Sequence, residues 1–185
     1  MKMQVIIVGA VLAASAMGKE AGVKQQVAKV DFIGFTQMSE EVRAYRELRR
    51  VSIEQFNTMA KEEGTVILDT RSKRNFDGRR IKGAVHLNFS EFSEEKLAKL
   101  IPDKNTRILI YCNNNFKDDP QTMMLKSAPL ALNIPTFINL YGYGYKNVYE
   151  LSDYLSVKDP RVQFEGDVVR AEKKQMSRLA IQKKE

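Results

Sequence analysis

The only cysteine of the chain, Cys112, ends a run of aliphatic and aromatic residues, RILIYC at 107–112. This run predicts a buried strand, and the carboxyl end of a strand in an open α/β sheet is the edge where ligands bind. A thiol is a nucleophile only as the thiolate, so a chemical role for Cys112 requires nearby N–H dipoles or cations that lower its pKa. The alternative interpretation, which strand position alone leaves open, is a small buried core residue.

Three asparagines follow the cysteine directly. Asparagine tolerates the left-handed backbone conformation, so Asn113, Asn114 and Asn115 are predicted to curl and to direct successive backbone N–H groups at an anion. Lys117 is predicted to add a cation. An ordinary turn is the other interpretation of these residues.

Other cysteine chemistry has little support in the sequence. His86 is the only histidine and lies in AVHLN, a predicted short strand, so a Cys–His dyad with Cys112 is the less favoured alternative. A zinc site built from cysteine and histidine lacks the ligands it would need. We therefore predict no metal and no cofactor.

The elements that position Cys112 follow from capping and periodicity. Ser39 is predicted to cap a helix over 40–50, and Ser52 with Gln55 forms a capping box for a second helix that stops at Gly64. Ser93 caps a short helix before Pro102. Buried strands are predicted at 65–69, 84–88, 106–112 and 147–151, and a further helix from about 133 to the glycines at 142 and 144. Strands that alternate with helices predict an α/β fold with a mainly parallel central sheet.

Composition limits the classes of function. The chain has 185 residues, of which 43% are hydrophobic and 29% charged, as expected of one globular domain with extensions. Its formal net charge of +7 is compatible with an anionic ligand, a membrane surface or nucleic acid. The basic residues are scattered and form no dense block with interleaved aromatic residues, so nucleic-acid binding is not predicted.

The first residues have the pattern of a signal peptide. Met1 and Lys2 give a positive start, 5–13 is apolar, and Ala14-Ser15-Ala16 is a small-residue cleavage pattern. We predict a signal peptide at 1–16 and a periplasmic or secreted mature protein without a stable membrane span. An uncleaved anchor is the alternative, but the apolar run is shorter than the roughly 20 residues that cross a bilayer. In an oxidising compartment, a lone cysteine indicates an intermolecular partner or a free reactive thiol.

Four segments in this order resemble the signatures of rhodanese-like sulfurtransferase domains: VILDTR (66–71), RRIKGAVHL (79–87), ILIYC (108–112) and LYGYGYKNVYEL (140–151). The resemblance implies a rhodanese-like α/β domain at 51–165, with a mainly parallel central sheet flanked by helices. An N-terminal linker and helical extension at 17–50 would precede it, and a charged C-terminal tail at 166–185, either a solvated helix or disordered, would follow.

The resemblance also implies an activity. Members of the family take a sulfane sulfur from a donor such as thiosulfate, carry it as a cysteine persulfide and pass it to cyanide or another thiophile. Cys112 would be the sulfur carrier. Its partners would be a small anionic sulfur donor and a thiophilic acceptor, either a small molecule or a protein thiol.

The other site residues are assigned by the same resemblance. The cradle for the persulfide and its anionic donor would be formed by Asn113, Asn114, Asn115, Phe116 and Lys117. Asp69 and Arg71 would support the site, the acid bonding to nearby backbone and the arginine pairing across the sheet edge. By their charge alone, Arg80, with Arg74 and Arg79, could add positive potential at the same edge in support of the site, but solvated surface charge is the favoured interpretation for each of the three.

Several positions depart from the family pattern. Asn115 stands where the family usually has a loop glycine, and Arg80 stands where it usually has a histidine, directly before the IKGA sequence at 81–84. The tryptophan that usually follows the last strand is missing. The segment between Cys112 and the next helix is longer than the family spacing. A rhodanese-like binding module that recruits a partner through this segment is thus the alternative to an enzyme. Cysteine phosphatases place an arginine where this chain has Asp118, so phosphatase activity is not predicted.

Overall fold

The computed structural model describes residues 28–182, so the predicted signal peptide lies outside the described residues. Within 28–182, no helix is both long and apolar enough to cross a membrane.

A five-stranded sheet forms the centre of the fold, in the order β1-β7-β5-β2-β4. Every neighbouring pair in it is parallel, as predicted. In the same order, the strands are Arg50–Val51, Val148–Leu151, Ile108–Tyr111, Val66–Asp69 and Val85–His86. Asp69 lies opposite Tyr111 in the register, so β2 and β5 end at the same edge, and Cys112 follows directly there.

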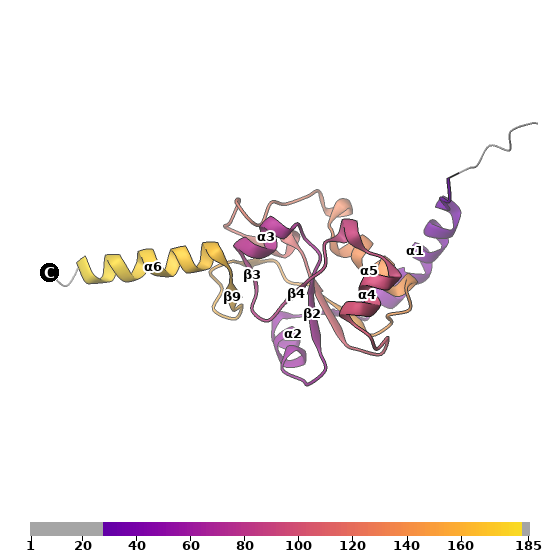
Figure 1. Cartoon of the computed structure of the whole chain (residues 1–185), viewed down its shortest axis with the longest axis horizontal. Helices are drawn as coiled ribbons and strands as arrows, with labels where there is room; N and C mark the ends of the chain where they lie inside the picture. Colours follow the sequence, from indigo (N-terminus) through magenta and orange to yellow (C-terminus); the bar gives the residue numbers. More distant parts are fainter. Residues whose placement is uncertain (1–27, 183–185) are drawn as a thin grey trace, which may run out of the picture. The chain divides into compact units, whose positions relative to one another are not determined.

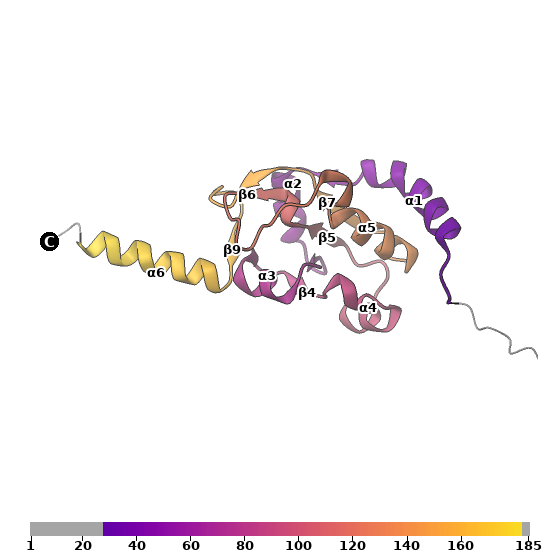
Figure 2. The same ribbon diagram turned by 90° about the horizontal axis from the view of Figure 1, so that it is seen from above.

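The two faces of the sheet pack against different helices. Successive side chains along β5 point to opposite faces of the sheet. Ile108 and Ile110 therefore pack in one core cluster, and Leu109 and Tyr111 pack in another. The first cluster includes side chains from α1, α4 and α5, which span Phe32–Glu47, Glu94–Leu100 and Asn133–Gly142. The second includes side chains from α2, α3 and α6, which span Ile53–Ala60, Lys73–Gly78 and Asp167–Gln182. Figures 1 and 2 show α1 beside α5.

Several helix boundaries agree with the capping signals. Ser52 and Gln55 form both halves of the capping box of α2, and Ser93 caps α4 by accepting from the Lys96 N–H. Gly64 lies in the turn after α2 with φ of 76°, a conformation that glycine adopts without steric cost. α5 begins at Asn133, as its pattern predicts.

The boundary predicted for the first helix was wrong. α1 starts at Phe32, and Ser39 lies inside it, where its Oγ donates to the Phe35 carbonyl at 2.7 Å. A serine that bonds back to the preceding turn can occupy a helix interior, so the residue type alone did not locate the helix start.

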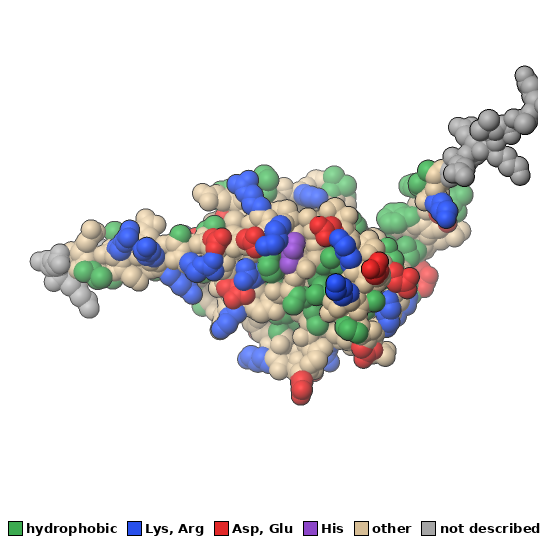
Figure 3. Space-filling model, in the orientation of Figure 1, with side chains coloured by type: hydrophobic (Ala, Val, Ile, Leu, Met, Phe, Trp, Pro, Cys, Tyr) green, Lys and Arg blue, Asp and Glu red, His purple; other side chains and the backbone are tan. Residues whose placement is uncertain are grey.

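Short elements complete the fold. β3 (Arg80–Ile81) pairs antiparallel with β9 (Phe164–Glu165), and β6 (Phe116–Lys117) pairs parallel with β8 (Leu155–Ser156). The 3-10 turns η1, η2 and η3 span Phe89–Glu91, Asn113–Asn115 and Ala128–Leu130. Of the two structures left open for the tail, the helix forms as α6, which carries many Lys and Arg side chains (Figure 3).

Candidate active site

Cys112 lies at the carboxyl end of β5, and only 1% of its surface is exposed. It lines a cavity of about 420 Å³. The walls come from the loops after β2 and β4, from the residues after Cys112, and from the segment before α5. Parallel strands bring these loops to one edge of the sheet, which is where the sequence placed the site.

The environment of the thiol differs from the one predicted. Burial raises the pKa of Cys112, and the carboxylate of Glu150 raises it further. The backbone N–H groups of Asn133, Asn114 and Leu132 act in the opposite direction. Because burial outweighs these dipoles, the expectation of a lowered pKa was wrong. The N–H group of Asn114 acts on the thiol as expected, whereas those of Leu132 and Asn133, at the N-terminus of α5, were not predicted.

The asparagines after Cys112 form the 3-10 turn η2, so their predicted left-handed conformation was wrong. In the described part of the chain, the one residue other than glycine with positive φ is Asp118, at 71°. Asn115 is buried, and its side-chain amide bonds to nearby backbone groups. Its Oδ1 accepts from the Cys112 N–H at 2.9 Å, and its Nδ2 donates to the Leu151 carbonyl at 2.8 Å.

The other two asparagines bind the long segment between β6 and α5, residues 118–132, which we call the crossover segment. Asn113 Nδ2 donates to the Met124 carbonyl at 2.9 Å. Asn114 makes two bonds to the Lys126 backbone, donating to its carbonyl at 2.7 Å and accepting from its N–H at 3.1 Å. Both asparagines line the cavity beside Cys112. The crossover segment is therefore held in place as a wall of the site.

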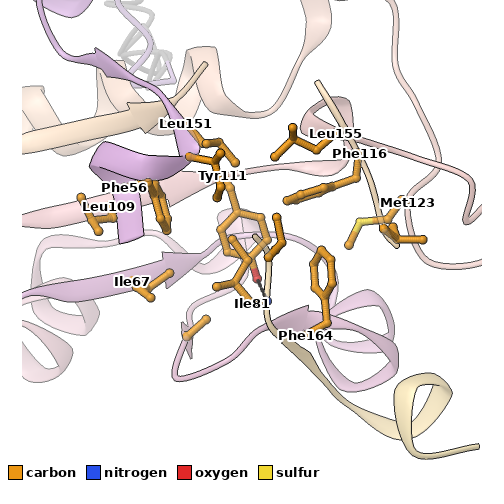
Figure 4. Packing of buried hydrophobic residues seen from close by; sticks show 14 of the residues in the cluster. Phe56, Ile67, Ile81, Leu109, Tyr111, Phe116, Met123, Leu151, Leu155 and Phe164 are labelled. Carbon is orange, nitrogen blue, oxygen red and sulfur yellow. Dashed lines mark hydrogen bonds between the residues drawn. The ribbon is translucent and has the colours of Figure 1, made fainter. Parts of the chain in front are cut away.

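Phe116 and Lys117 lie away from this cavity. Phe116 is fully buried and packs edge-on against Tyr111 and Phe164, with ring centroids 6.0 and 5.1 Å apart (Figure 4). Lys117 is exposed beside the Tyr154 ring. Of the five predicted cradle residues, Asn113 and Asn114 line the cavity, whereas Asn115, Phe116 and Lys117 do not.

Asp69 and Arg71 form a buried ion pair, with 2.7 Å between Arg71 Nη2 and Asp69 Oδ2. Asp69 also accepts from the Arg71 N–H at 3.0 Å and from Tyr111 Oη at 2.5 Å. The Tyr111 hydroxyl in turn accepts from the Ile81 N–H, a bond drawn in Figure 4. Arg71 Nη1 reaches Asn113 Oδ1 at 3.1 Å, and Arg71 lines the cavity. This pair therefore connects the end of β2 to the residues after Cys112.

The other arginines occupy different environments. Arg79 is 3% exposed and pairs with Asp119 and Glu172 at 2.6 Å each, so surface charge was the wrong interpretation for it. Arg80, on β3, pairs with Glu165 at 3.1 Å and does not line the cavity, whereas Arg74 is exposed.

His86 bonds to backbone and not to Cys112. Its Nε2 lies 2.8 Å from the Arg71 carbonyl, and its ring packs on Phe76 with centroids 4.7 Å apart. It does not line the cavity with Cys112, so the structure gives no support to a dyad.

Sequence reasoning missed the ion pair of Glu150 and Arg46, although Glu150 acts on the thiol. Glu150 is 5% exposed on β7, although the NVYEL pattern indicated only a strand. Arg46 on α1 holds its carboxylate with two bonds of 2.6 Å. The available signal was a charged residue in a strand expected to be buried, because such a charge requires a partner. The position of that partner, more than 100 residues earlier, was not readable from the sequence.

Comparison with known proteins agrees with the motifs. The rhodanese-like domain family matches residues 52–153. A curated relative, the adenylyltransferase and sulfurtransferase uba4 of Sclerotinia sclerotiorum, is 26% identical over 110 residues, which cover 56% of this chain and 24% of the relative. The chain thus matches about a quarter of that protein's length.

The similar solved structures have lower sequence identity to this chain. The BH2092 protein of Bacillus halodurans is 18% identical, with 70% of this chain and 86% of that chain covered and a TM-score of 0.45. A rhodanese with anions from E. coli is 20% identical, with coverage of 56% and 99% and a TM-score of 0.38. Because the family match extends over more than half of its residues, the chain belongs to the rhodanese-like domain family.

Proposed function

We propose that this protein is a sulfurtransferase in which Cys112 carries a sulfane sulfur as a persulfide. The observation that supports this most directly is the placement of the thiol against a cavity, among the backbone N–H groups of Asn114, Leu132 and Asn133. Converging N–H dipoles stabilise a sulfur anion, whether thiolate or persulfide, without a metal or a neighbouring base.

The chemistry balances without a further reagent. After the thiol loses its proton to solvent, the Cys112 thiolate attacks the sulfane sulfur of a donor such as thiosulfate. A new S–S bond forms to Cys112, the S–S bond of thiosulfate breaks, and sulfite leaves with the electron pair. A thiophile such as cyanide then attacks the terminal sulfur. Thiocyanate forms, and the electron pair of the broken S–S bond returns to Cys112 as thiolate.

Thiocyanate formation from thiosulfate and cyanide tests this proposal. We expect activity in the mature protein and none in Cys112→Ser, which keeps the size of the side chain but lacks the sulfur. Lys117→Ala is a matched control outside the cavity and should retain activity, because Lys117 is exposed away from Cys112. Equal activity in Cys112→Ser would contradict the proposal.

A rhodanese-like binding module is the second candidate. It is favoured by the burial of Cys112 and by the raised pKa that this burial causes. Met124, Leu125 and Leu130 on the crossover segment are exposed by 54–68% and would provide an apolar contact surface. The module predicts that neither wild type nor Cys112→Ser transfers sulfur from thiosulfate or from a persulfide donor.

We also propose export, with Met17 as the first mature residue. The support is the sequence alone, namely the positive start, the apolar run and the small-residue pattern at 14–16. Expression of the full chain in a bacterial host, followed by fractionation and N-terminal sequencing, tests it. Recovery of uncleaved protein from the cytoplasm would contradict this proposal.

A further inference from the structure

A buried carboxylate lies under the candidate active site. Glu150 pairs in register with Ile110, two residues before Cys112, and is 5% exposed. Its negative charge acts directly on the thiol and disfavours the thiolate. A carboxylate at this position opposes the proposed chemistry unless a cation offsets it.

That cation comes from outside the family match. Arg46 lies on α1, whereas the match begins at residue 52. Its Nε and Nη2 each bond one carboxylate oxygen of Glu150 at 2.6 Å, a bidentate arrangement that fixes both groups. The helix is held near this position by Tyr45, which contacts the Phe137 ring on α5 and donates to the Lys146 carbonyl at 2.6 Å.

A chain of hydrogen bonds leads from this ion pair to Cys112. Asn133 Nδ2 donates to Glu150 Oε1 at 3.4 Å and to Asn115 Oδ1 at 3.1 Å. The same Asn115 oxygen accepts from the Cys112 N–H at 2.9 Å. Asn133 also directs its own backbone N–H toward the thiol. Glu150 thus fixes the side chain of a residue that supplies one of the N–H dipoles at the thiol.

The other charged groups near the site have different partners. Arg71 is committed to Asp69. Lys126 lies on the cavity wall and is exposed, and Glu47 contacts the outer side of Arg46 at 3.5 Å. Arg49, also on the α1 side, places its guanidinium 3.9 Å from the centre of the Tyr45 ring. Arg46 is therefore the cation that pairs with Glu150 among residues 28–182.

We propose that Arg46 is a positioning residue for Cys112, which makes the helix before the matched domain part of the site. It offsets the charge of Glu150 and holds Glu150 and Asn133 where the N–H groups meet the thiol. This inference rests on the proposed function of Cys112 as sulfur carrier.

The pH profile of Cys112 alkylation by iodoacetamide tests the inference in the full chain. In Arg46→Met, the buried carboxylate loses its cation, so the midpoint of the profile should move to higher pH. The alkylation rate at mildly alkaline pH should fall about fivefold or more. The reason is that an uncompensated buried charge close to a titrating group shifts its pKa by about one unit or more. The midpoint, unlike the absolute rate, does not depend on how easily the reagent reaches the buried thiol.

Three further variants separate charge from structure. Arg46→Met combined with Glu150→Gln should return the midpoint toward wild type, because both charges are then absent. Glu150→Gln alone should move it to lower pH. Arg43→Met is the matched control, since Arg43 lies on the same helix in an exposed pair with Glu40 and should leave the profile unchanged.

An unchanged midpoint in folded Arg46→Met, or no recovery in the double variant, would overturn the inference. If Arg46→Met does not fold by circular dichroism, Glu150→Gln decides, because a wild-type midpoint there would also overturn it. Failure of the proposed function would appear differently, as absent sulfur transfer by wild type. The alkylation profiles would still report whether Arg46 and Glu150 act on the thiol.

Discussion

Cys112 is subject to two opposing influences. Burial and Glu150 raise its pKa, while N–H groups from two elements lower it, and burial is the largest effect. A raised pKa means that little thiolate is present at neutral pH. The thiol should therefore react more slowly than a cysteine with the ordinary pKa of about 8.5.

The native thiol should therefore be alkylated by iodoacetamide more slowly at neutral pH than the same cysteine in urea-unfolded chain. The native rate should rise with pH through a range above that of the unfolded chain. The sign of the stability effect follows, because stability tied to the neutral thiol is present below the unfolded pKa and is lost as pH rises through the folded one. A native thiol that reacts faster than the unfolded one at neutral pH would contradict this.

The pair formed by Asp69 and Arg71 should contribute strongly to stability. Arg71→Met would leave the buried Asp69 carboxylate without its cation, and we expect a loss of about 3–5 kcal/mol in the free energy of unfolding. Urea denaturation monitored by circular dichroism measures it. Lys73→Met, which removes an exposed partner of Asp77, is the control and should cost much less. Equal losses in the two variants would be the opposite of this expectation.

At the scale of elements, the crossover segment explains how a long connection still serves the site. It runs from β6 to α5 and is tied at Met124 and Lys126 by the asparagines of η2. α5 therefore begins where its N-terminal N–H groups reach Cys112, despite the extra residues before it. The longer connection contributes to the wall of the cavity, while β5 still pairs in parallel with β2 and β7.

The turn between β9 and α6 requires a glycine at position 166. Its φ is 135°, and a Cβ there would lie 2.4 Å from the Gly78 carbonyl oxygen of α3. Gly166→Ala must therefore move backbone, and we expect it to destabilise the fold by more than about 2 kcal/mol. Gly64→Ala is the control, because Gly64 also has positive φ but nothing within 4 Å of the added atom. Thermal unfolding compares them, and a larger loss in Gly64→Ala would refute this account of the turn.

At the scale of the whole molecule, an ion cluster links parts far apart in the sequence. Arg79 contacts Asp119 in the crossover segment and Glu172 on α6. Although burial opposes it, hydrogen bonds from Thr122 and Arg79 lower the pKa of Asp119. Its contribution to stability is therefore present above the unfolded value of about 3.9 and is lost as pH falls through the lower folded value.

Asp119→Asn should accordingly be less stable than wild type at neutral pH, by about 3 kcal/mol for a broken buried pair. The difference should begin to shrink as pH falls below about 4, where the carboxyl of the unfolded chain becomes neutral, and should close below the lower pKa of the folded protein. Urea denaturation over a pH series measures this. Asp77→Asn, in an exposed pair with Lys73, is the matched control and should show a smaller difference. A gap that stays constant at acid pH would contradict the assigned role of Asp119.

The parts of this fold that could be predicted were those with local causes. The capping box at Ser52, the apolar runs of β2 and β5, and the ordered motifs led to the sheet and to the placement of Cys112. Of the two-residue strands, β4 was predicted within 84–88, whereas β1, β3, β6, β8 and β9 carry too little periodicity to detect. The ion pairs Arg46–Glu150 and Arg79–Asp119 join residues separated by 40 or more positions, and only the folded chain brings them together.

The most direct test of the central claim is the intact mass of the mature protein after brief incubation with thiosulfate and removal of excess donor. We predict a gain of one sulfur atom, mapped to the peptide containing Cys112, lost on addition of cyanide and absent from Cys112→Ser. Wild type that gains no sulfur from thiosulfate or from a persulfide donor, with its thiol intact, would contradict the assignment of Cys112 as a sulfur carrier.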